Sequence, residues 1–421
     1  MSFFSNILRK NFPALTSRDY SIFWVGQFLS LIGTWMQSTT QPYLAYRLSG
    51  NPFDLGLIGM ANTLPMFFLA LPGGVLVERF DKRKTVIAMQ FVMMLQAFLL
   101  AAVTLLGIVQ IWHIVVLSFL LGVAAAIEIT ARQAMLVELV GKEHLPNAIA
   151  LQATIFQAAR VIGPAMMVPF LVMIKGSGEG YAFLANGISY LIVITGLFFV
   201  RTPYRLPVVK TDLKIVSDLK ESLAYIKSTK TVGMIIIMAM VFGTIGFPLL
   251  QQLPVFGRDV LATALDSESV IATRTSLLFT FLGLGALISA FSLAAFNPKA
   301  KGRLLVIGQL VFTGGVLSLG VSKVQNFSLG FVFMIGLGMV ATLATMNTLI
   351  QMEVPNSLRG RVFSTYLWGL QGLSPFGSIA IGWAATVAGI QTTTIIAGII
   401  CLLMVVSIQY LSPEIRRIVD S

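Results

Sequence analysis

Twelve long apolar stretches, separated by short polar ones, dominate this sequence. A window of about 19 residues places them at roughly 22–48, 54–77, 85–109, 111–137, 147–174 and 181–200, and then at 231–253, 270–296, 303–321, 328–352, 361–385 and 392–411. A helix needs about 20 apolar residues to cross a bilayer, so each stretch can cross once. Runs such as 114–121 do not alternate apolar and polar residues as strands of a membrane β-barrel do. The pattern predicts an all-α membrane protein with twelve transmembrane helices.

A polar segment at residues 201–230 divides these stretches into two sets of six. It begins with Pro203 and Pro207 and carries seven basic residues. Apolar residues recur in it at helical spacing, at Ile215, Val216, Leu219, Leu223 and Ile226. They predict a short amphipathic helix on the membrane surface, with docking of a partner as the alternative. We therefore expect a six-helix bundle at 1–200, a cytoplasmic linker at 201–230 and a second, related bundle at 231–421, with a path between the bundles.

Composition and charge placement agree with a multi-pass membrane protein. Hydrophobic residues make up 56% of the chain and charged residues 11%, against about a quarter charged in soluble domains. The net charge is +12, but the basic residues lie between the apolar stretches, which excludes a nucleic-acid-binding patch and suits membrane lipids. If the amino terminus is cytoplasmic, 22 of the 29 Lys and Arg fall on the cytoplasmic side. This bias predicts cytoplasmic termini in a bacterial-type cytoplasmic membrane.

Residues for enzymatic or metal chemistry are sparse. Cys401 is the single cysteine, and His113 and His144 have no ligand partners at metal-binding spacing. No G-x-x-x-x-G-K-[ST] loop for nucleotide phosphates occurs. We expect a protein that is not an enzyme and carries no metal or other cofactor.

The connection after the second predicted span carries a recognisable motif. Residues 73–84 read GGVLVERFDKRK and resemble the loop signature of the major facilitator superfamily, G-x-L-a-D-R-x-G-R-R. The matching positions are Gly74, Glu78, Arg79, Lys82 and Arg83, with Glu78 in place of the usual aspartate and Asp81 in place of the usual glycine. Further segments, ARQA at 131–134, ELV at 138–140, LPNA at 145–148, RVIGP at 160–164 and RGRV at 359–362, are similar to the branch that contains enterobactin and macrolide exporters.

The resemblance implies alternating access by rocking of the two bundles, usually driven by protons. Gly163 and Pro164 match part of a fifth-span motif associated with antiporters. The implied function is export of small amphipathic molecules by proton antiport, performed by a monomer. Two alternatives stay open, a lipid or lysolipid transporter and a non-transporting receptor or scaffold on the same fold.

Charges of the motif loop suit a latch. Glu78 ends an apolar helix beside several cations, so its carboxylate can bind Arg79, Arg83 or a neighbouring helix end in one conformation and release them in another. The simpler interpretation is that these charges only mark the cytoplasmic boundary.

Three charged residues lie within predicted spans. Because a charge inside a membrane is energetically costly, such residues are candidates for a functional role. They are Glu128, Arg132 and Arg160, and Glu128 is the only carboxylate clearly inside a span. Glu128 and Arg160 lie at one depth, about 20 Å from the turn that joins their spans, and Arg132 follows Glu128 at i+4. The group could bind a proton or an anionic part of the cargo. Alternatively it is a static ion pair between the fourth and fifth spans.

Polar and aromatic residues on other spans are candidates for a cargo cavity. The first span offers Gln27, Trp35, Gln37 and Gln41, and the second half offers Asn347, Trp368 and Gln371. A cavity with charge on one wall and apolar surface on the other suits an amphipathic molecule. Hydrogen bonds between helices are the alternative role for such side chains.

Overall fold

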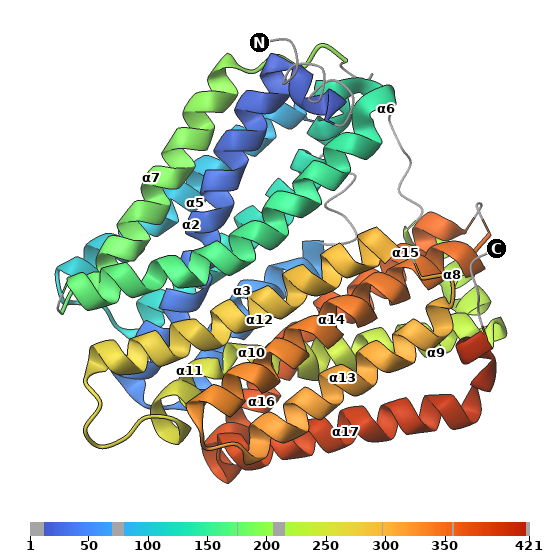
Figure 1. Cartoon of the computed structure of the whole chain (residues 1–421). Helices are drawn as coiled ribbons and strands as arrows, with labels where there is room; N and C mark the ends of the chain where they lie inside the picture. The colour runs from blue at the N-terminus through green and yellow to red at the C-terminus, as the bar shows by residue number, and fades with distance from the viewer. Residues whose placement is uncertain are drawn as a thin grey trace. The chain divides into compact units, whose positions relative to one another are not determined.

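The computed structural model describes residues 12–69, 80–174, 176–204, 215–296, 298–355 and 358–417 (Figure 1). Every secondary-structure element in these ranges is helical, including the short terminal helices η1 (Pro13–Thr16) and η5 (Pro413–Arg417). The first half contains α2 (Arg18–Ser49), α3 (Pro52–Leu69), α5 (Lys82–Leu105), α6 (Ile111–Met173) and α7 (Gly178–Phe199).

The second half begins with α8 (Ile215–Ser228), which lies in the polar linker. One interrupted helix follows, made of α9 (Lys230–Val241), η2 (Phe242–Gly246), α10 (Phe247–Gln251), α11 (Leu253–Val255) and η3 (Phe256–Val260). The remaining elements are α12 (Glu268–Phe296), α13 (Lys301–Val321), α14 (Gln325–Glu353), α15 (Arg359–Leu367), η4 (Trp368–Gly372), α16 (Ser374–Ala388) and α17 (Ile390–Leu411).

Together these helices cover all the predicted spans. Within the described ranges, nine helical segments are long and apolar enough to cross a membrane. Among them α6 covers two predicted spans, while α2 and the interrupted helix from α15 to α16 cover the two predicted spans outside the nine. The prediction of an all-α membrane protein is confirmed, and the described helices agree with the predicted count of twelve spans.

A break at Gly141 divides α6 into its two spans. At 1.5 Å per residue, an unbroken helix of the length of α6 would run for about 95 Å, far more than a bilayer core of about 30 Å. Gly141 has φ 71° and ψ 175°, which ends one helix and starts the next. This left-handed conformation is favourable only for glycine among the common residues, so Gly141 fixes the position of the turn.

Contacts divide the chain into two units. The first comprises residues 1–41 and 72–213, and the second comprises 42–71 and 214–421. The predicted bundles, in contrast, divide the chain at the linker alone. The division into bundles at 1–200 and 231–421 stays a prediction.

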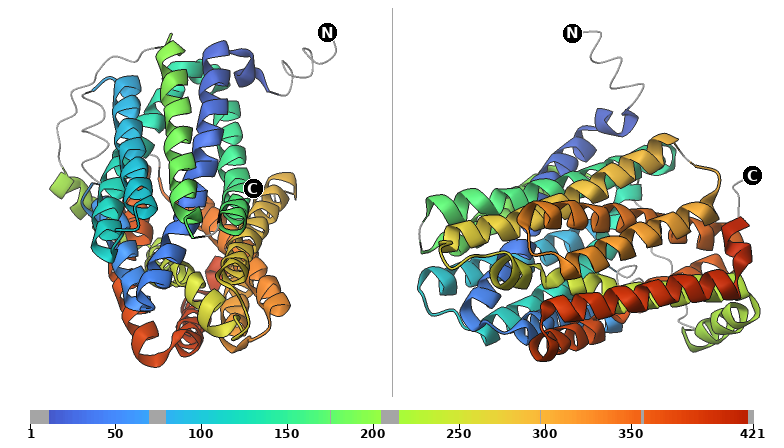
Figure 2. Two further views of the ribbon diagram at one scale, coloured as in Figure 1. Left: turned by 90° about the vertical axis from the view of Figure 1, so that its left-hand side faces the viewer. Right: turned by 60° about the horizontal axis from the view of Figure 1, so that its bottom comes forward.

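In the first unit, α5 packs against both α6 and α7, and α2, α5 and α7 run side by side (Figure 2, left). Polar contacts fasten α2 to the second arm of α6. The hydroxyl of Tyr20 donates to the carbonyl of Ala148 at 3.0 Å, and Trp24 Nε1 donates to the carbonyl of Leu151 at 3.3 Å. The same residues pack in an apolar cluster that includes Phe23, so bonds and packing together hold α2 against the second arm of α6.

In the second unit, α13 packs between α14 and α17, α12 packs on α14, and α3 packs along α16. Figure 2 (right) shows α13 and α17 lying side by side. The α3–α16 contact depends on small residues, since a Cβ added to Gly382 would lie 3.0 Å from the Cα of Gly56. Close backbone approach at such positions is a common way for membrane helices to associate.

Candidate functional site

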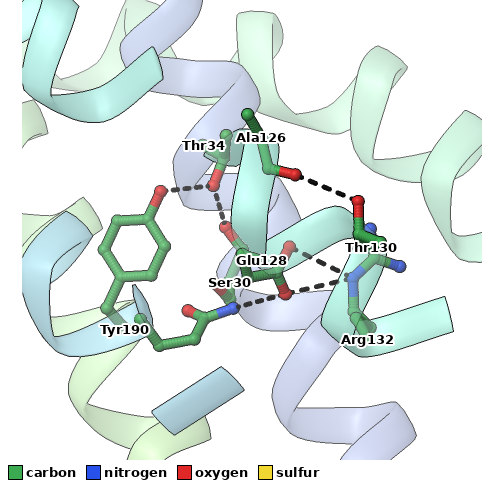
Figure 3. A network of polar contacts seen from close by, with 8 residues as sticks. Ser30, Thr34, Ala126, Glu128, Thr130, Arg132 and Tyr190 are labelled. Atoms are coloured by element: carbon green, nitrogen blue, oxygen red, sulfur yellow. Dashed lines mark hydrogen bonds and ion pairs between the residues drawn. The ribbon is translucent and has the colours of Figure 1, made fainter. Parts of the chain in front are cut away.

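A buried carboxylate lies at the centre of the first unit. Glu128 on α6 is 4% exposed. Its Oε1 accepts hydrogen bonds from Nε2 of Gln90 on α5 and from Nε of Arg132, both at 3.1 Å, and its Oε2 lies 3.3 Å from the same Nε (Figure 3). The i+4 spacing predicted that Glu128 and Arg132 share one helix face. The structure joins them as an ion pair and adds Gln90, which the sequence did not indicate.

Hydroxyl groups of two further helices lie beside this pair. Thr34 on α2 donates to the carbonyl of Ser30 at 2.8 Å, and its hydroxyl lies 2.9 Å from that of Tyr190 on α7. Figure 3 shows Tyr190, Thr34 and Ser30 next to Glu128. Helices α2, α5, α6 and α7 therefore all supply polar groups to the surroundings of one carboxylate.

Arg160, the third predicted charge, contacts an aromatic ring. Its guanidinium lies over the ring of Trp35 at 5.4 Å from the centroid, and Trp35 also meets Phe156 edge to face at 5.5 Å. A cation over an indole ring is attracted by the electron-rich face of the ring. The structure thus places Trp35 and Arg160 together, whereas the carboxylate of Glu128 is paired with Arg132.

The predicted antiporter-type residues pack the second arm of α6 against α2. Gly163 and Pro164 are both buried. A Cβ added to Gly163 would lie 2.5 Å from Cβ of Trp35 and 2.8 Å from the backbone nitrogen of Met36. Because only glycine fits there, Gly163 allows the close contact that sets Trp35 beside Arg160.

Two other carboxylates in the described chain are also buried. Glu138 is 5% exposed and Glu179 is 4% exposed. Glu138 lies just before the break at Gly141, and Glu179 lies in the first turn of α7. Both are at helix ends, so Glu128 remains the carboxylate placed within the length of a span.

The motif loop is described only in part. Gly74, Glu78 and Arg79 lie outside the described residues. Asp81 begins α5 by accepting a hydrogen bond from the backbone nitrogen of Lys84 at 2.9 Å, and Lys82 Nζ donates to the carbonyl of Phe80 at 3.0 Å. These contacts give Asp81 the role of a helix cap.

Arg83 binds the end of another helix. Its Nε donates to the carbonyl of Leu197 and its Nη2 to the carbonyl of Phe198, both at 2.8 Å. Carbonyls at a helix C-terminus lack partners within the helix and attract cations. In this conformation Arg83 thus binds the end of α7. The proposed latch role of Glu78 stays a prediction.

Two of the candidate cargo residues on α2 belong to a buried hydrogen-bond network. Gln37 donates to Gln96 of α5 at 3.1 Å and to Gln41 at 3.3 Å, and it accepts from Asn186 of α7 at 2.7 Å. Gln41 in turn donates to Ser118 of α6 at 2.5 Å. These partners support the alternative role of joining helices, and contact with cargo stays a prediction.

Gln27, on the same helix, differs from them. It is 3% exposed, and its Oε1 has no hydrogen-bond partner in the described part of the protein. A buried acceptor without a partner costs free energy, and such a group is available to a water or a ligand.

The candidates of the second half lie on α14 and in η4. Asn347 accepts a hydrogen bond from Gln351, Trp368 meets the ring of Phe67 at a centroid distance of 5.3 Å, and Gln371 is exposed. The structure does not join these three side chains to one another by any described hydrogen bond or ring contact. Their role as one cavity wall stays a prediction.

Two π-helical segments pack against each other in the second unit, η2 and η4. A Cβ added to Gly243 would collide with the carbonyl oxygen of Leu370, and one added to Gly377 would collide with that of Thr244. π-Helical turns are rare and occur frequently at functional sites. The sequence signal was the concentration of Gly and Pro in these two spans, which the hydropathy reading did not use.

Another cluster was missed by the sequence reasoning. At the end of α2, the hydroxyl of Tyr43 donates to Oε2 of Glu268 at 3.2 Å, and that of Tyr46 donates to Asp259. Glu268 also pairs with Arg258, with Nη1 3.0 Å from Oε1. Nearby, Asn51 Oδ1 accepts from Thr386 Oγ1 at 2.9 Å. Together these bonds hold residues 43–51 to the second half of the chain.

Comparison with known proteins identifies the family. The sequence profile of the family described as transmembrane secretion effector, a branch of the major facilitator superfamily, matches residues 10–418. The chain belongs to this family. The transporter is 25% identical over 391 residues to the staphyloferrin A transporter of Staphylococcus aureus, covering 91% of this chain and 94% of the relative.

Other relatives of the transporter are exporters. It is 22% identical to macrolide efflux protein A of Streptococcus pyogenes, over 91% of this chain and 93% of the relative. It is also 22% identical to the enterobactin exporter of Citrobacter koseri, over 93% and 91%. The resemblance to enterobactin and macrolide exporters is therefore confirmed.

Solved structures support the same fold. The transporter superposes with a TM-score of 0.71 on a bacterial homologue of the human lysosomal transporter Spinster in an inward-facing, unoccupied conformation. The match covers 96% of this chain and 99% of the other at 12% identity. The protein is a multi-pass membrane transporter with the major facilitator fold.

Proposed function

We propose that this transporter exports small amphipathic molecules across the bacterial cytoplasmic membrane by proton antiport, with alternating access of one cargo path. The observation that carries the proposal is the buried Glu128, which is held by Arg132 and Gln90 inside a bundle of apolar helices. The relatives named as exporters support the outward direction.

Glu128 is the group that would carry the proton. Arg132 lies 3.1 Å from the carboxylate, and its positive charge offsets part of the cost of burying the negative one. If the side chain of Arg132 turns away as α5 moves relative to α6, the carboxylate is isolated in an apolar interior, which is costly, and it takes up a proton. Proton binding thereby depends on conformation, which is the requirement for coupling.

Arg132 and Arg160 divide the remaining roles. Arg132 is on the same helix as Glu128 and moves with it, so it loses the carboxylate only by changing its own side-chain conformation. Arg160 is on the other arm of α6 and lies over Trp35. We infer that Glu128 pairs with Arg160 in one state of the cycle, that the carboxylate takes its proton when this pair is open, and that the ring of Trp35 offers an apolar contact for cargo.

A screen followed by a transport assay tests the proposal. Purified protein is melted in the presence of enterobactin, erythromycin or lysophosphatidylcholine, because a ligand that binds the native state raises the melting temperature. Any compound that stabilises the protein is then offered to proteoliposomes with an imposed pH gradient. We expect movement of a siderophore or antibiotic against its gradient. Movement of lysophosphatidylcholine alone, or no movement of any stabilising compound, would contradict the proposal.

A further inference from the structure

The linker helix α8 is fastened to the second unit by its polar residues. The hydroxyl of Tyr225 donates to the backbone carbonyl of Glu353 at 3.1 Å, and the hydroxyls of Ser222 and Thr365 lie 3.3 Å apart. Glu221 forms an ion pair with Arg361. Polar groups make these contacts, whereas the apolar residues Leu223 and Ile226 of α8 line a pocket beside α9.

A pocket of about 390 Å³ lies at the junction of α8, α9 and α15. Its walls are mostly apolar, with Leu223 and Ile226 from α8 and Met234 and Ile237 from α9. Leu223 is 49% exposed and Ile237 is 47% exposed, so the apolar wall continues onto the surface. The volume is in the range of about 300 to 1,000 Å³ that holds small ligands.

Two lysines lie at the same pocket. Lys227 belongs to the last turn of α8 and Lys230 begins α9, and both are exposed. Neither forms an ion pair with an acidic residue of the described chain, whereas the neighbouring Glu221 is already paired with Arg361. The pocket therefore combines unneutralised positive charge with an apolar wall.

We propose that this pocket binds one anionic phospholipid from the leaflet on the linker side, with its phosphate on Lys227 and Lys230 and an acyl chain along the apolar wall. Lys230 marks the start of a membrane span, which is the depth at which lipid phosphates lie. Basic pockets between helices at this level bind acidic lipid headgroups. The exposed Leu223 and Ile237 connect the pocket to the hydrocarbon region, where an acyl chain can enter sideways.

This site is separate from the proposed cargo path. All its residues belong to α8, α9 and α15 of the second unit, and none is among the candidates for cargo or proton binding. A bound lipid would stabilise the docking of α8, and through it the start of the interrupted helix that contains η2.

Lipid binding by the full-length protein in detergent tests the site without any transport assay. Delipidated protein is titrated with dioleoylphosphatidylglycerol, dioleoylphosphatidylcholine or glycerol 3-phosphate, and retained lipid is counted by mass spectrometry of the intact protein. We expect dioleoylphosphatidylglycerol to bind at one saturable site and to raise the melting temperature. The other two probes should have much weaker effects. The choline lipid lacks net charge, and glycerol 3-phosphate lacks an acyl chain.

Variants locate the binding. Each lysine near a membrane surface contributes about fivefold to anionic lipid affinity, so K227Q/K230Q should weaken binding about thirtyfold, and K227R/K230R should retain it. K323Q, which removes an exposed lysine elsewhere in the second unit, is the matched control and should bind as the parent does. M234W should lose the lipid by filling the pocket. Equal binding of both lipids, parent-like binding by K227Q/K230Q, or equal loss in K323Q would overturn the proposal.

Discussion

Arg132 holds the carboxylate of Glu128 from one helical turn further along α6, with 3.1 Å between Nε and Oε1. A partner on the same helix does not leave when helices shift as rigid bodies. The second partner of the carboxylate, Gln90, lies on α5, so relative movement of α5 and α6 changes the hydrogen bonding of Glu128 first. The coupling proposed above depends on this difference between the two partners.

The position of Arg83 predicts a measurable loss of stability. Because it donates to two carbonyls at the end of α7, Arg83→Ala should lower the stability of the protein by about 1 to 2 kcal/mol and also slow turnover. Melting of purified variants, with Lys84→Ala as the control from the same loop, measures the first effect. Glu78→Ala should slow turnover with cargo binding retained. Parent-like transport by both Glu78→Ala and Arg83→Ala would show that the charges only set topology.

The close contact at Gly163 predicts strong sensitivity to a single methyl group. In Gly163→Ala the new Cβ must displace Trp35 or the backbone of Met36, which should destabilise the protein by roughly 1 to 3 kcal/mol. Gly330→Ala is the matched control, since a Cβ there meets nothing within 4 Å and alanine favours a helix. The melting temperature should fall for the first variant and stay level or rise for the second. The reverse order would refute this packing argument.

If the bundles divide at the linker as predicted, the proposed alternating access opens the contact between Asn51 and Thr386 during each cycle. Their side chains touch at 2.9 Å, and the native Cys401 is buried. The variant N51C/T386C should therefore form a crosslink under oxidising conditions, lose transport, and recover it on reduction. Single-cysteine variants serve as controls. A crosslinked protein that transports at the parent's rate would show that the contact stays closed during transport.

The charge bias predicts the orientation in the membrane. Reporter fusions at Ser421 and near Lys210 should both be active only as cytoplasmic reporters, since 22 of the 29 basic residues lie on that side in the proposed topology. Activity of a periplasmic reporter at either position would show that the predicted topology is wrong.

Hydropathy alone was enough to place the spans, because a stretch of about 20 apolar residues has few alternatives to crossing a bilayer. The shared helix face of Glu128 and Arg132 also followed from the sequence, because of their i+4 spacing. Gln90 did not, because its contact with Glu128 depends on how α5 is rotated against α6. The bonds of Gln37 to Gln96 and Asn186 could not be predicted for the same reason.

Hydropathy also did not predict the features that interrupt helices. A window average does not register the single residue Gly141 that turns α6, nor the π-helical turns η2 and η4. The interaction of Tyr46 with Asp259 joins residues far apart in sequence, and nothing in local spacing reports such a pair.

A purely static pair of Glu128 with Arg132, the partner that the structure shows, makes its own prediction for Glu128. Removing one partner of a buried pair costs about 3 to 5 kcal/mol, so on that view Glu128→Gln is poorly stable and inactive in every assay. Replacing both charges, as in E128Q/R132M, would then restore the melting temperature. The coupling proposal instead expects Glu128→Gln to fold, because glutamine keeps the shape of the side chain and one acceptor for Arg132.

The role of Glu128 in proton coupling is tested by measuring proton-driven and downhill transport by Glu128→Gln side by side in proteoliposomes. The cargo is whichever siderophore or antibiotic stabilises the parent protein, and the parent is assayed in parallel. If Glu128 carries the proton, the variant binds this cargo and exchanges it down its gradient at a rate near the parent's, but does not accumulate it when a pH gradient is imposed. A stable Glu128→Gln protein that accumulates cargo in response to the pH gradient as well as the parent does would contradict it.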